Sequence, residues 1–352
     1  MRTRVLILFF TVSLSVAYLN CSRNEVVEPA VPKGTAFELT ASDYATNYFF
    51  VDTSYLRLYE PFFQNTAPII TDPAKQIVEI EVWQSFYGNN WVDLLNSIQG
   101  IAHISLPERH NGYDSILRQS IPVDGRIEGA RFARLDSRHF ELIGDGLLGL
   151  VAFRTLINDN QILAVAYRTA DGKQFGEFSR NFSPADTNVT RILKLIKPKN
   201  LIVVGPIYNF AWKLMLKSVY QIGVMDVSKN DFSFDVWRRS SGIEDATDLM
   251  GHRTLRVMGL DRYNSVGVPV PDGDNVFDFL PGHTINPQYG EIILPSLRPF
   301  DTGIRKYFQE RGVSLSDSSE FLCSAAYDTT KTEARRHYTN RYFLRGRART
   351  RE

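Results

Sequence analysis

The chain contains almost no cysteine. Only Cys21 and Cys323 occur in 352 residues, so a disulfide scaffold is excluded and burial of apolar side chains must stabilise the fold. With 43% hydrophobic and 12% aromatic residues, the chain can bury a sizeable core, and its length suggests about two domains. Because Cys21 falls in a polar leader, we expect Cys323 to be a free, buried thiol.

An excess of charge of one sign is also missing. Lys plus Arg number 40 and Asp plus Glu number 39, which gives a formal net charge of +1. This balance argues against nucleic acid or an anionic membrane as a dedicated partner. Arginines gather only between Arg335 and Arg351. We interpret this stretch as a solvated strand edge followed by a basic tail at 347–352.

The motifs of common enzyme classes are absent. The six histidines are scattered, with no H-E-x-x-H pair and no cysteine at zinc spacing. Neither a G-x-S-x-G elbow nor a Walker loop nor a G-x-G-x-x-G turn occurs. The sequence therefore predicts that this protein is not an enzyme.

Long apolar runs are missing beyond the N-terminus. Arg2 and Arg4 precede the apolar run Val5–Val16, which indicates an export signal over 1–20, followed by a flexible leader over 21–39. Two processing routes stay open: cleavage after Ala17, or attachment of lipid at Cys21. No later segment reaches about 18 consecutive apolar residues, so no transmembrane helix is expected.

Strand patterns dominate the rest of the chain. We expect strands over 78–83, 161–167, 201–204, 232–236 and 291–294 from alternation or short apolar runs. Apolar stripes predict helices from Pro206 to near Gly223 and over 301–312, with shorter ones at 54–63 and 330–338. The predicted fold is α+β and β-rich: two packed β-sandwich-like lobes, at 40–182 and 183–346, with a few short helices and no complete transmembrane barrel.

The stretch 258–294 is a loop rich in acids, amides, glycine and proline. Its oxygen-bearing candidates for a calcium site are Asp261, Asn264, Asp272, Asp274 and Asp278. Calcium takes about six to eight oxygen ligands, so these side chains could form part of a cage, although their spacing differs from an EF-hand. The other interpretation is that they cap turns by hydrogen bonds to the backbone.

The same loop carries a resemblance to a known family. Gly259-Leu-Asp-Arg262 with Asn264, then Pro271-Asp-Gly273, Phe277-Asp-Phe279, Thr284-Ile-Asn286 and Pro299-Phe300 resemble the recurrent module of the SprA/Sov translocon. Further stretches follow in the order of that module, from Ile80-Glu-Val-Trp83 to Asn340-Arg-Tyr342. The similarity covers about 40–346, nearly all of the mature chain.

The resemblance implies a role in type IX protein secretion and gliding motility of Bacteroidetes. The expected location is the outer membrane, on its periplasmic or cell-surface side, with the translocon barrel and other secretion components as partners. Membrane association would come through those partners or a lipid anchor. Because members of that family are several times longer, this chain is expected to be a stand-alone or truncated module. The alternative is a cell-surface protein that binds a glycan or a protein, with Trp83, Trp91 and Trp237 lining the site.

Overall fold

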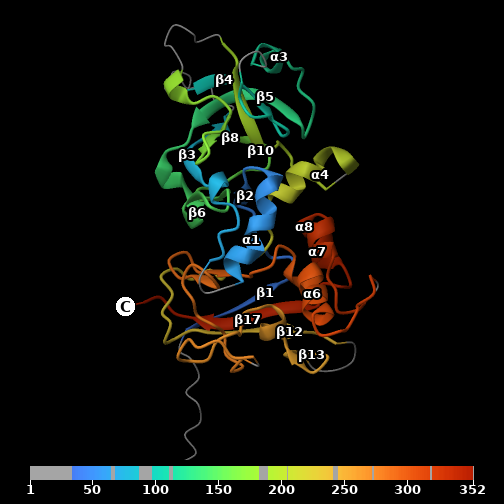
Figure 1. The fold of residues 1–352 in the computed structure, drawn as a ribbon. Helices are drawn as coiled ribbons and strands as arrows, with labels where there is room; N and C mark the ends of the chain where they lie inside the picture. Colours follow the sequence, from blue (N-terminus) through green and yellow to red (C-terminus); the bar gives the residue numbers. More distant parts are fainter. Residues whose placement is uncertain are drawn as a thin grey trace, which may run out of the picture. The chain divides into compact units, whose positions relative to one another are not determined.

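The computed structural model describes residues 34–64, 68–86, 97–110, 114–181, 189–203, 205–240, 245–271, 273–317 and 319–351. The expected signal, most of the expected leader, Cys21, Trp91 and Asp272 lie outside these ranges. The fold is β-rich, with several sheets and a few short helices, which confirms the predicted class (Figure 1). None of the helices in the described ranges is long and apolar enough to cross a membrane.

The strands are β1 (Thr35–Thr40), β2 (Tyr48–Phe50), β3 (Ile77–Ser85), β4 (Ser97–His103), β5 (Ile127–Arg134), β6 (Phe140–Ile143), β7 (Leu150–Phe153), β8 (Leu163–Thr169), β9 (Gln174–Phe175), β10 (Arg191–Lys197), β11 (Val219–Gln221), β12 (Ser233–Arg238), β13 (Asp248–Leu249), β14 (His252–Arg253), β15 (Ile285–Asn286), β16 (Glu291–Ile293) and β17 (Tyr342–Ala348). The α-helices are α1 (Leu56–Phe63), α3 (Asp114–Arg118), α4 (Gly205–Leu214), α5 (Thr254–Val257), α6 (Ile304–Gln309), α7 (Ala325–Asp328) and α8 (Lys331–Arg336).

The largest sheet closes on itself. Its order is β10-β4-β5-β3-β8-β9, and a further pairing of β10 with β8 joins the two sides into a small five-stranded barrel. Val82, Phe132, Val165 and Leu193 are fully buried in its core. Gly100 is needed on β4 because a Cβ there would lie 2.7 Å from Cδ2 of Phe132.

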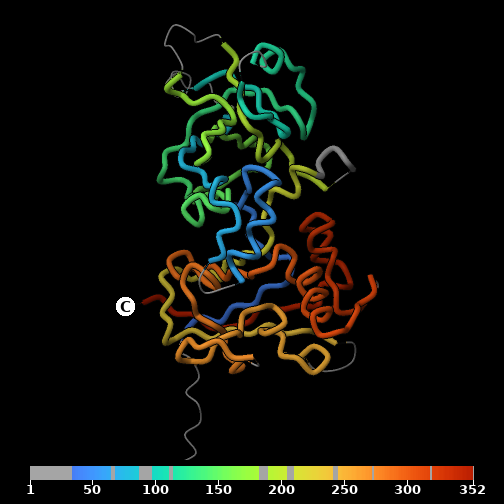
Figure 2. Tube along the Cα trace, viewed as in Figure 1, coloured from blue at the N-terminus to red at the C-terminus, as the bar shows by residue number. Residues whose placement is uncertain are grey.

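A second sheet joins the two ends of the described chain. Strand β17 lies between β1 and β12 and pairs antiparallel with both, and Figure 2 shows the blue first strand beside the red last one. The expectation of a strand edge at the arginine-rich end was therefore wrong, since β17 is central. Gly346 permits this position, because a Cβ there would lie 2.0 Å from the Ser233 carbonyl oxygen.

A buried ion pair links strands that are far apart in sequence. Glu291 on β16 is fully buried, and its Oε1 accepts a hydrogen bond from Nη1 of Arg154 at 3.0 Å. The Tyr48 hydroxyl donates to Oε2 of Glu291 at 2.6 Å, and the Arg154 guanidinium lies 3.7 Å from the centroid of the Tyr289 ring. The contact therefore joins β2 and β16 to Arg154, which directly follows β7. Removing one partner of such a pair would leave an uncompensated buried charge.

Several local expectations were wrong in instructive ways. In β3, Val78 is 53% exposed whereas Ile77 is 3% exposed, because a bulge between Ile77 and Glu79 shifts the alternation. Residues 201–203 form no strand. Helix α4 ends at Leu214, and Val219, expected on the helix, belongs to β11 paired with β16. The expected boundary at 182–183 lies outside the described residues, and β8 pairs with strands on both sides of it, β9 and β10.

Cys323 is confirmed as a free, fully buried cysteine. Thr339 lies 3.8 Å from its sulfur. Burial raises the pKa of the thiol, so it is an unreactive packing residue.

Candidate functional site

The acidic loop between α5 and β16 is fixed to the β1–β17–β12 sheet by phenylalanines. The ring centroid of Phe277 lies 5.0 Å from that of Phe234 and 5.5 Å from that of Phe232, and Phe279 lies 5.3 Å from Phe232. Phe37 on β1 stacks on Phe234 of β12 and on Phe232, which directly precedes that strand. The two rings of Phe277-Asp-Phe279 thus anchor the loop, and the acid between them is free for another contact.

Asp261 closes the middle of the loop. Its side chain is buried, and its Oδ1 and Oδ2 accept hydrogen bonds from the backbone N–H groups of Asp274 at 2.8 Å and Asn275 at 3.2 Å. Burial raises the pKa of this carboxyl, although the two N–H donors oppose the shift. Both carboxylate oxygens therefore hold loop backbone across thirteen residues of sequence.

Asp278 holds the start of the loop. Its Oδ2 accepts from the backbone N–H groups of Arg262 at 2.6 Å and Tyr263 at 3.3 Å. Burial raises the pKa of Asp278 to about 6, and the negative charges of Asp261 and Asp274 act in the same direction. The next turn is held by Thr284, whose hydroxyl donates to the Asp278 carbonyl oxygen.

The remaining predicted ligands also bond to nearby backbone. Oδ1 of Asn264 accepts from Val268 N–H at 2.9 Å and Val266 N–H at 3.2 Å, and Oδ1 of Asp274 accepts from Val276 N–H at 3.0 Å. These are the turn-capping contacts of one of the two interpretations. In the described part of the chain, no group of three or more His, Cys, Asp or Glu side chains is placed to hold a metal ion. Asp272 lies outside it, and calcium binding stays a prediction.

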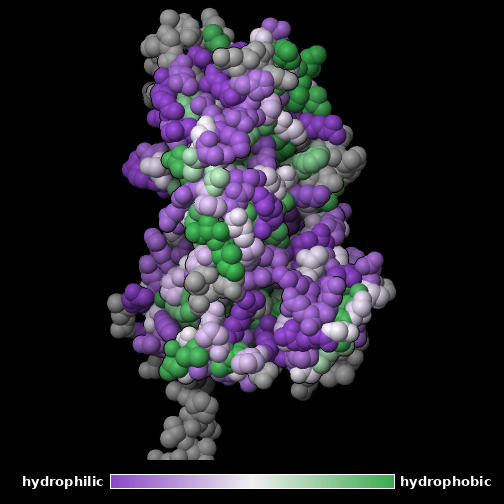
Figure 3. Space-filling view, viewed as in Figure 1, coloured by the Kyte–Doolittle hydropathy of each residue, from purple (hydrophilic) through white to green (hydrophobic). Residues whose placement is uncertain are grey.

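The loop also presents apolar side chains to solvent. Val266 is 79% exposed, Val268 is 53% exposed and Val276 is 61% exposed. In Figure 3 apolar surface appears at the lower edge of the molecule, where Figure 1 draws this loop in orange. We call these three residues the valine surface. The expectations from the sequence did not include this surface, although valines on both sides of Gly267 indicate a hairpin tip.

Two residues of the valine surface, Val266 and Val268, lie on a short hairpin. The Asn264 N–H donates to the Val268 carbonyl oxygen at 2.9 Å and the Val270 N–H donates to the Arg262 carbonyl oxygen at 2.9 Å. Gly267 makes the tip with a left-handed φ of +80° and has no atom near its missing Cβ. Val266 and Val268 are therefore held on a hydrogen-bonded frame.

Two of the three tryptophans expected to line a ligand site lie in the described residues. Trp83 is 2% exposed and belongs to the core. Trp237 is half-buried on β12, with the Arg345 guanidinium 5.7 Å from the centroid of its ring. Trp91 lies outside the described residues.

Searches against known protein families and against curated proteins give no match for this chain.

Proposed function

We propose that this protein is a non-enzymatic docking module of a SprA/Sov-type translocon, and that it acts in type IX secretion across the outer membrane and in gliding motility. The support is the loop motif that carries the resemblance. Hydrogen bonds from its described polar residues hold the loop together, and the loop exposes the valine surface. A partner of the secretion machinery would cover this surface.

The observation that carries the proposal is that polar and apolar side chains of the loop have different roles. The carboxylates of Asp261 and Asp278 accept hydrogen bonds from backbone N–H groups, whereas Val266 and Val268 are exposed to solvent. When a partner buries exposed apolar side chains, the free energy falls by about 25 cal/mol per Å² of apolar surface removed from water. A rigid frame lowers the entropy lost on binding, which favours docking to one partner.

The carboxyls of Asp261 and Asp278 have a structural use within the loop. In the described residues each carboxylate accepts two backbone N–H bonds. These contacts support the non-enzymatic role in this proposal.

The test is recovery of an identified partner. We would purify the tagged mature protein from detergent-solubilised outer membrane of a bacterium that has the type IX machinery, and identify co-purifying proteins by mass spectrometry. Val266→Asp places a charge on the valine surface. Ile121→Asp is the matched control, since Ile121 is 80% exposed and Val266 is 79% exposed.

We expect the translocon barrel or another type IX component with the wild-type protein and with Ile121→Asp, and its loss with Val266→Asp. Recovery that is equal for both variants would contradict docking through the loop. Failure of the wild-type protein to bring down any secretion component would contradict the function itself.

A further inference from the structure

A cavity of about 570 Å³ lies beside α4, away from the acidic loop. Its size falls within the range of small-molecule sites, about 300–1,000 Å³. The residues that line it are Phe50, Leu56, Val203, Trp212, Lys213, Met215, Leu216, Lys217, Leu297, Arg298, Tyr327 and Asp328.

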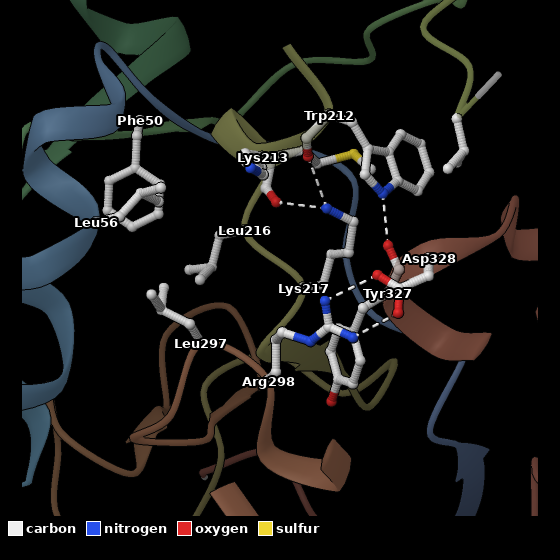
Figure 4. Close-up of a pocket in the computed structure, with 12 residues that line it drawn as sticks. Phe50, Leu56, Trp212, Lys213, Leu216, Lys217, Leu297, Arg298, Tyr327 and Asp328 are labelled. Carbon is white, nitrogen blue, oxygen red and sulfur yellow. Dashed lines mark hydrogen bonds and ion pairs between the residues drawn. The ribbon is translucent and has the colours of Figure 1, made fainter. Parts of the chain in front are cut away.

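The lining is divided between an apolar wall and a charged wall. Figure 4 shows Phe50, Leu56, Leu216 and Leu297 on one side, and Lys217, Arg298 and Asp328 with two aromatic rings on the other. An apolar chain suits the first wall, and a polar head suits the second. This separation is the pattern expected for an amphiphilic ligand.

The charged wall carries more positive than negative charge. Three cations, Lys213, Lys217 and Arg298, line the cavity with one carboxylate, that of Asp328. Arg298 is already balanced, because it forms a two-pronged contact with Asp328 at 2.8 and 2.6 Å and reaches Asp301 at 2.6 Å. The uncompensated charge therefore belongs to the two lysines.

Lys217 is the unusual group in this wall. It is 6% exposed, and its ammonium donates to the carbonyl oxygens of Trp212 at 2.8 Å and Met215 at 2.9 Å. The ammonium also lies 4.5 Å from the centroid of the Trp212 ring. In the described ranges no carboxylate forms a salt bridge with it. A buried cation without a counter-ion is costly, and an anion in the cavity would supply one.

The aromatic part of this wall is held in place. The Trp212 indole N–H donates to the Tyr327 carbonyl oxygen at 2.6 Å, and the Arg298 guanidinium lies 4.9 Å from the centroid of the Tyr327 ring. Lys213, which is exposed, marks where the cavity reaches solvent. A ligand can therefore enter without opening the fold.

From this arrangement we infer that the cavity binds a single-chain carboxylate amphiphile, a free fatty acid, with the alkyl chain against Phe50, Leu56 and Leu297 and the carboxylate toward the ammonium of Lys217. The site is separate from the valine surface and does not depend on the proposed docking function.

The test compares three ligands of equal chain length and different charge by isothermal titration calorimetry. We would titrate the protein with decanoate, decanol and decyltrimethylammonium below their micelle concentrations. One-to-one binding of decanoate is expected, with decanol at least about tenfold weaker, which corresponds to about 1.4 kcal/mol, and no binding of the cation. Equal affinity for decanoate and decanol would overturn the carboxylate assignment.

Variants test whether decanoate binds in this cavity. Leu297→Trp fills the apolar wall from a half-buried position and should abolish binding, whereas Leu156→Trp, at a residue 81% exposed outside the cavity, should leave it unchanged. Lys217→Met should remove the preference for decanoate over decanol. Because Lys217 is buried, the exposed Lys213→Met gives a second measurement, with a smaller loss of that preference expected. Decanoate binding that survives Leu297→Trp would overturn the proposal.

The pH dependence supplies a readout that a structural lysine would not give. Burial lowers the pKa of Lys217 to about 7, the charge of Arg298 lowers it further, and Asp328 opposes both. A bound carboxylate favours the charged ammonium, so decanoate affinity should rise as the pH falls from about 8 to about 6, by at most tenfold per unit. Lys217→Met should remove this rise.

An anionic lipid in a bilayer also combines alkyl chains with a negatively charged head group. Co-sedimentation with phosphatidylglycerol vesicles should be absent or unaffected by Leu297→Trp. Vesicle binding that this variant abolishes would assign the cavity to a membrane lipid and overturn the assignment to a free fatty acid.

Discussion

The backbone N–H of Arg262 donates to Oδ2 of Asp278 over 2.6 Å, and this contact joins the start of the acidic loop to a residue 16 positions further along the chain. The Tyr263 N–H shares the same oxygen at 3.3 Å. Asp261, in contrast, uses both carboxylate oxygens, one for each of two N–H donors. Substitution by asparagine keeps one acceptor oxygen and replaces the other with an NH₂ donor. This substitution should therefore affect Asp261 and Asp278 differently.

Asp278→Asn should be tolerated and Asp261→Asn should not. An asparagine at 278 can keep its carbonyl oxygen toward Arg262 and Tyr263, so we expect the free energy of unfolding at pH 7 to fall by less than about 1 kcal/mol or to rise. At 261 an amide NH₂ would face a backbone N–H, and we expect a loss of about 1–3 kcal/mol. Urea unfolding followed by circular dichroism measures both. Equal losses for the two variants would contradict the assigned contacts.

The stability of the protein should depend on pH through Asp278. Its pKa is raised from the ordinary value of 3.8 to about 6, so between these values the folded state binds more protons than the unfolded state. The contribution of Asp278 to the free energy of unfolding is therefore favourable below about pH 4 and is lost as the pH rises through about 6. Asp278→Asn should flatten this decline in melts taken at intervals of pH. An unchanged slope in the variant would show that Asp278 titrates normally.

Two glycines of the loop give a matched pair of alanine substitutions. Gly267 and Gly273 both have left-handed φ values, +80° and +63°, and alanine in this region costs about 1–2 kcal/mol of strain. A Cβ at 267 meets nothing within 4 Å, whereas a Cβ at 273 would lie 2.2 Å from Oδ1 of Asp261. Gly273→Ala should therefore cost about 1–3 kcal/mol more than Gly267→Ala, because Asp261 must also shift. Equal unfolding free energies would contradict this packing.

Local chemistry in the loop was predictable from sequence, and long-range pairing was not. Acids, amides and glycines in a short span indicate turn caps whatever the fold around them, and Asn264 with its two N–H donors shows that pattern. The central place of β17 depends on its pairing with β1, over 300 residues earlier in the chain. Nothing in the alternation of one strand says which neighbours it will have. Closure of the large sheet by β10 and β8 is non-local in the same way.

The cavity beside α4 was also out of reach of the sequence. Lys217 follows a helix whose expected length was too great, and a lysine near a helix end is ordinarily solvated. It is buried here because the chain turns from α4 into β11, where Tyr220 is fully buried. Which residues surround this cavity, Tyr327 and Arg298 among them, depends on segments that are distant in the sequence, and no local pattern contains that information.

Lys217 should give the unliganded protein a stability that rises with pH. Its pKa falls from the ordinary value of 10.5 to about 7 because burial disfavours the ammonium, so between these values the unfolded state binds more protons than the folded state. The free energy of unfolding should then increase with pH above about 7, by up to about 1.4 kcal/mol per unit from this group. Lys217→Met should remove that share of the slope. Burial also lowers the pKa of Lys197 to about 8, but Lys197 is present in both the wild-type protein and the variant. The measurement is the urea midpoint of each protein at pH 7 and at pH 9, converted to a free energy of unfolding with the m-value. The change between the two pH values, compared between the two proteins, gives the contribution of Lys217. Parallel pH profiles for the two proteins would mean that the ammonium is as well solvated in the fold as in the unfolded chain.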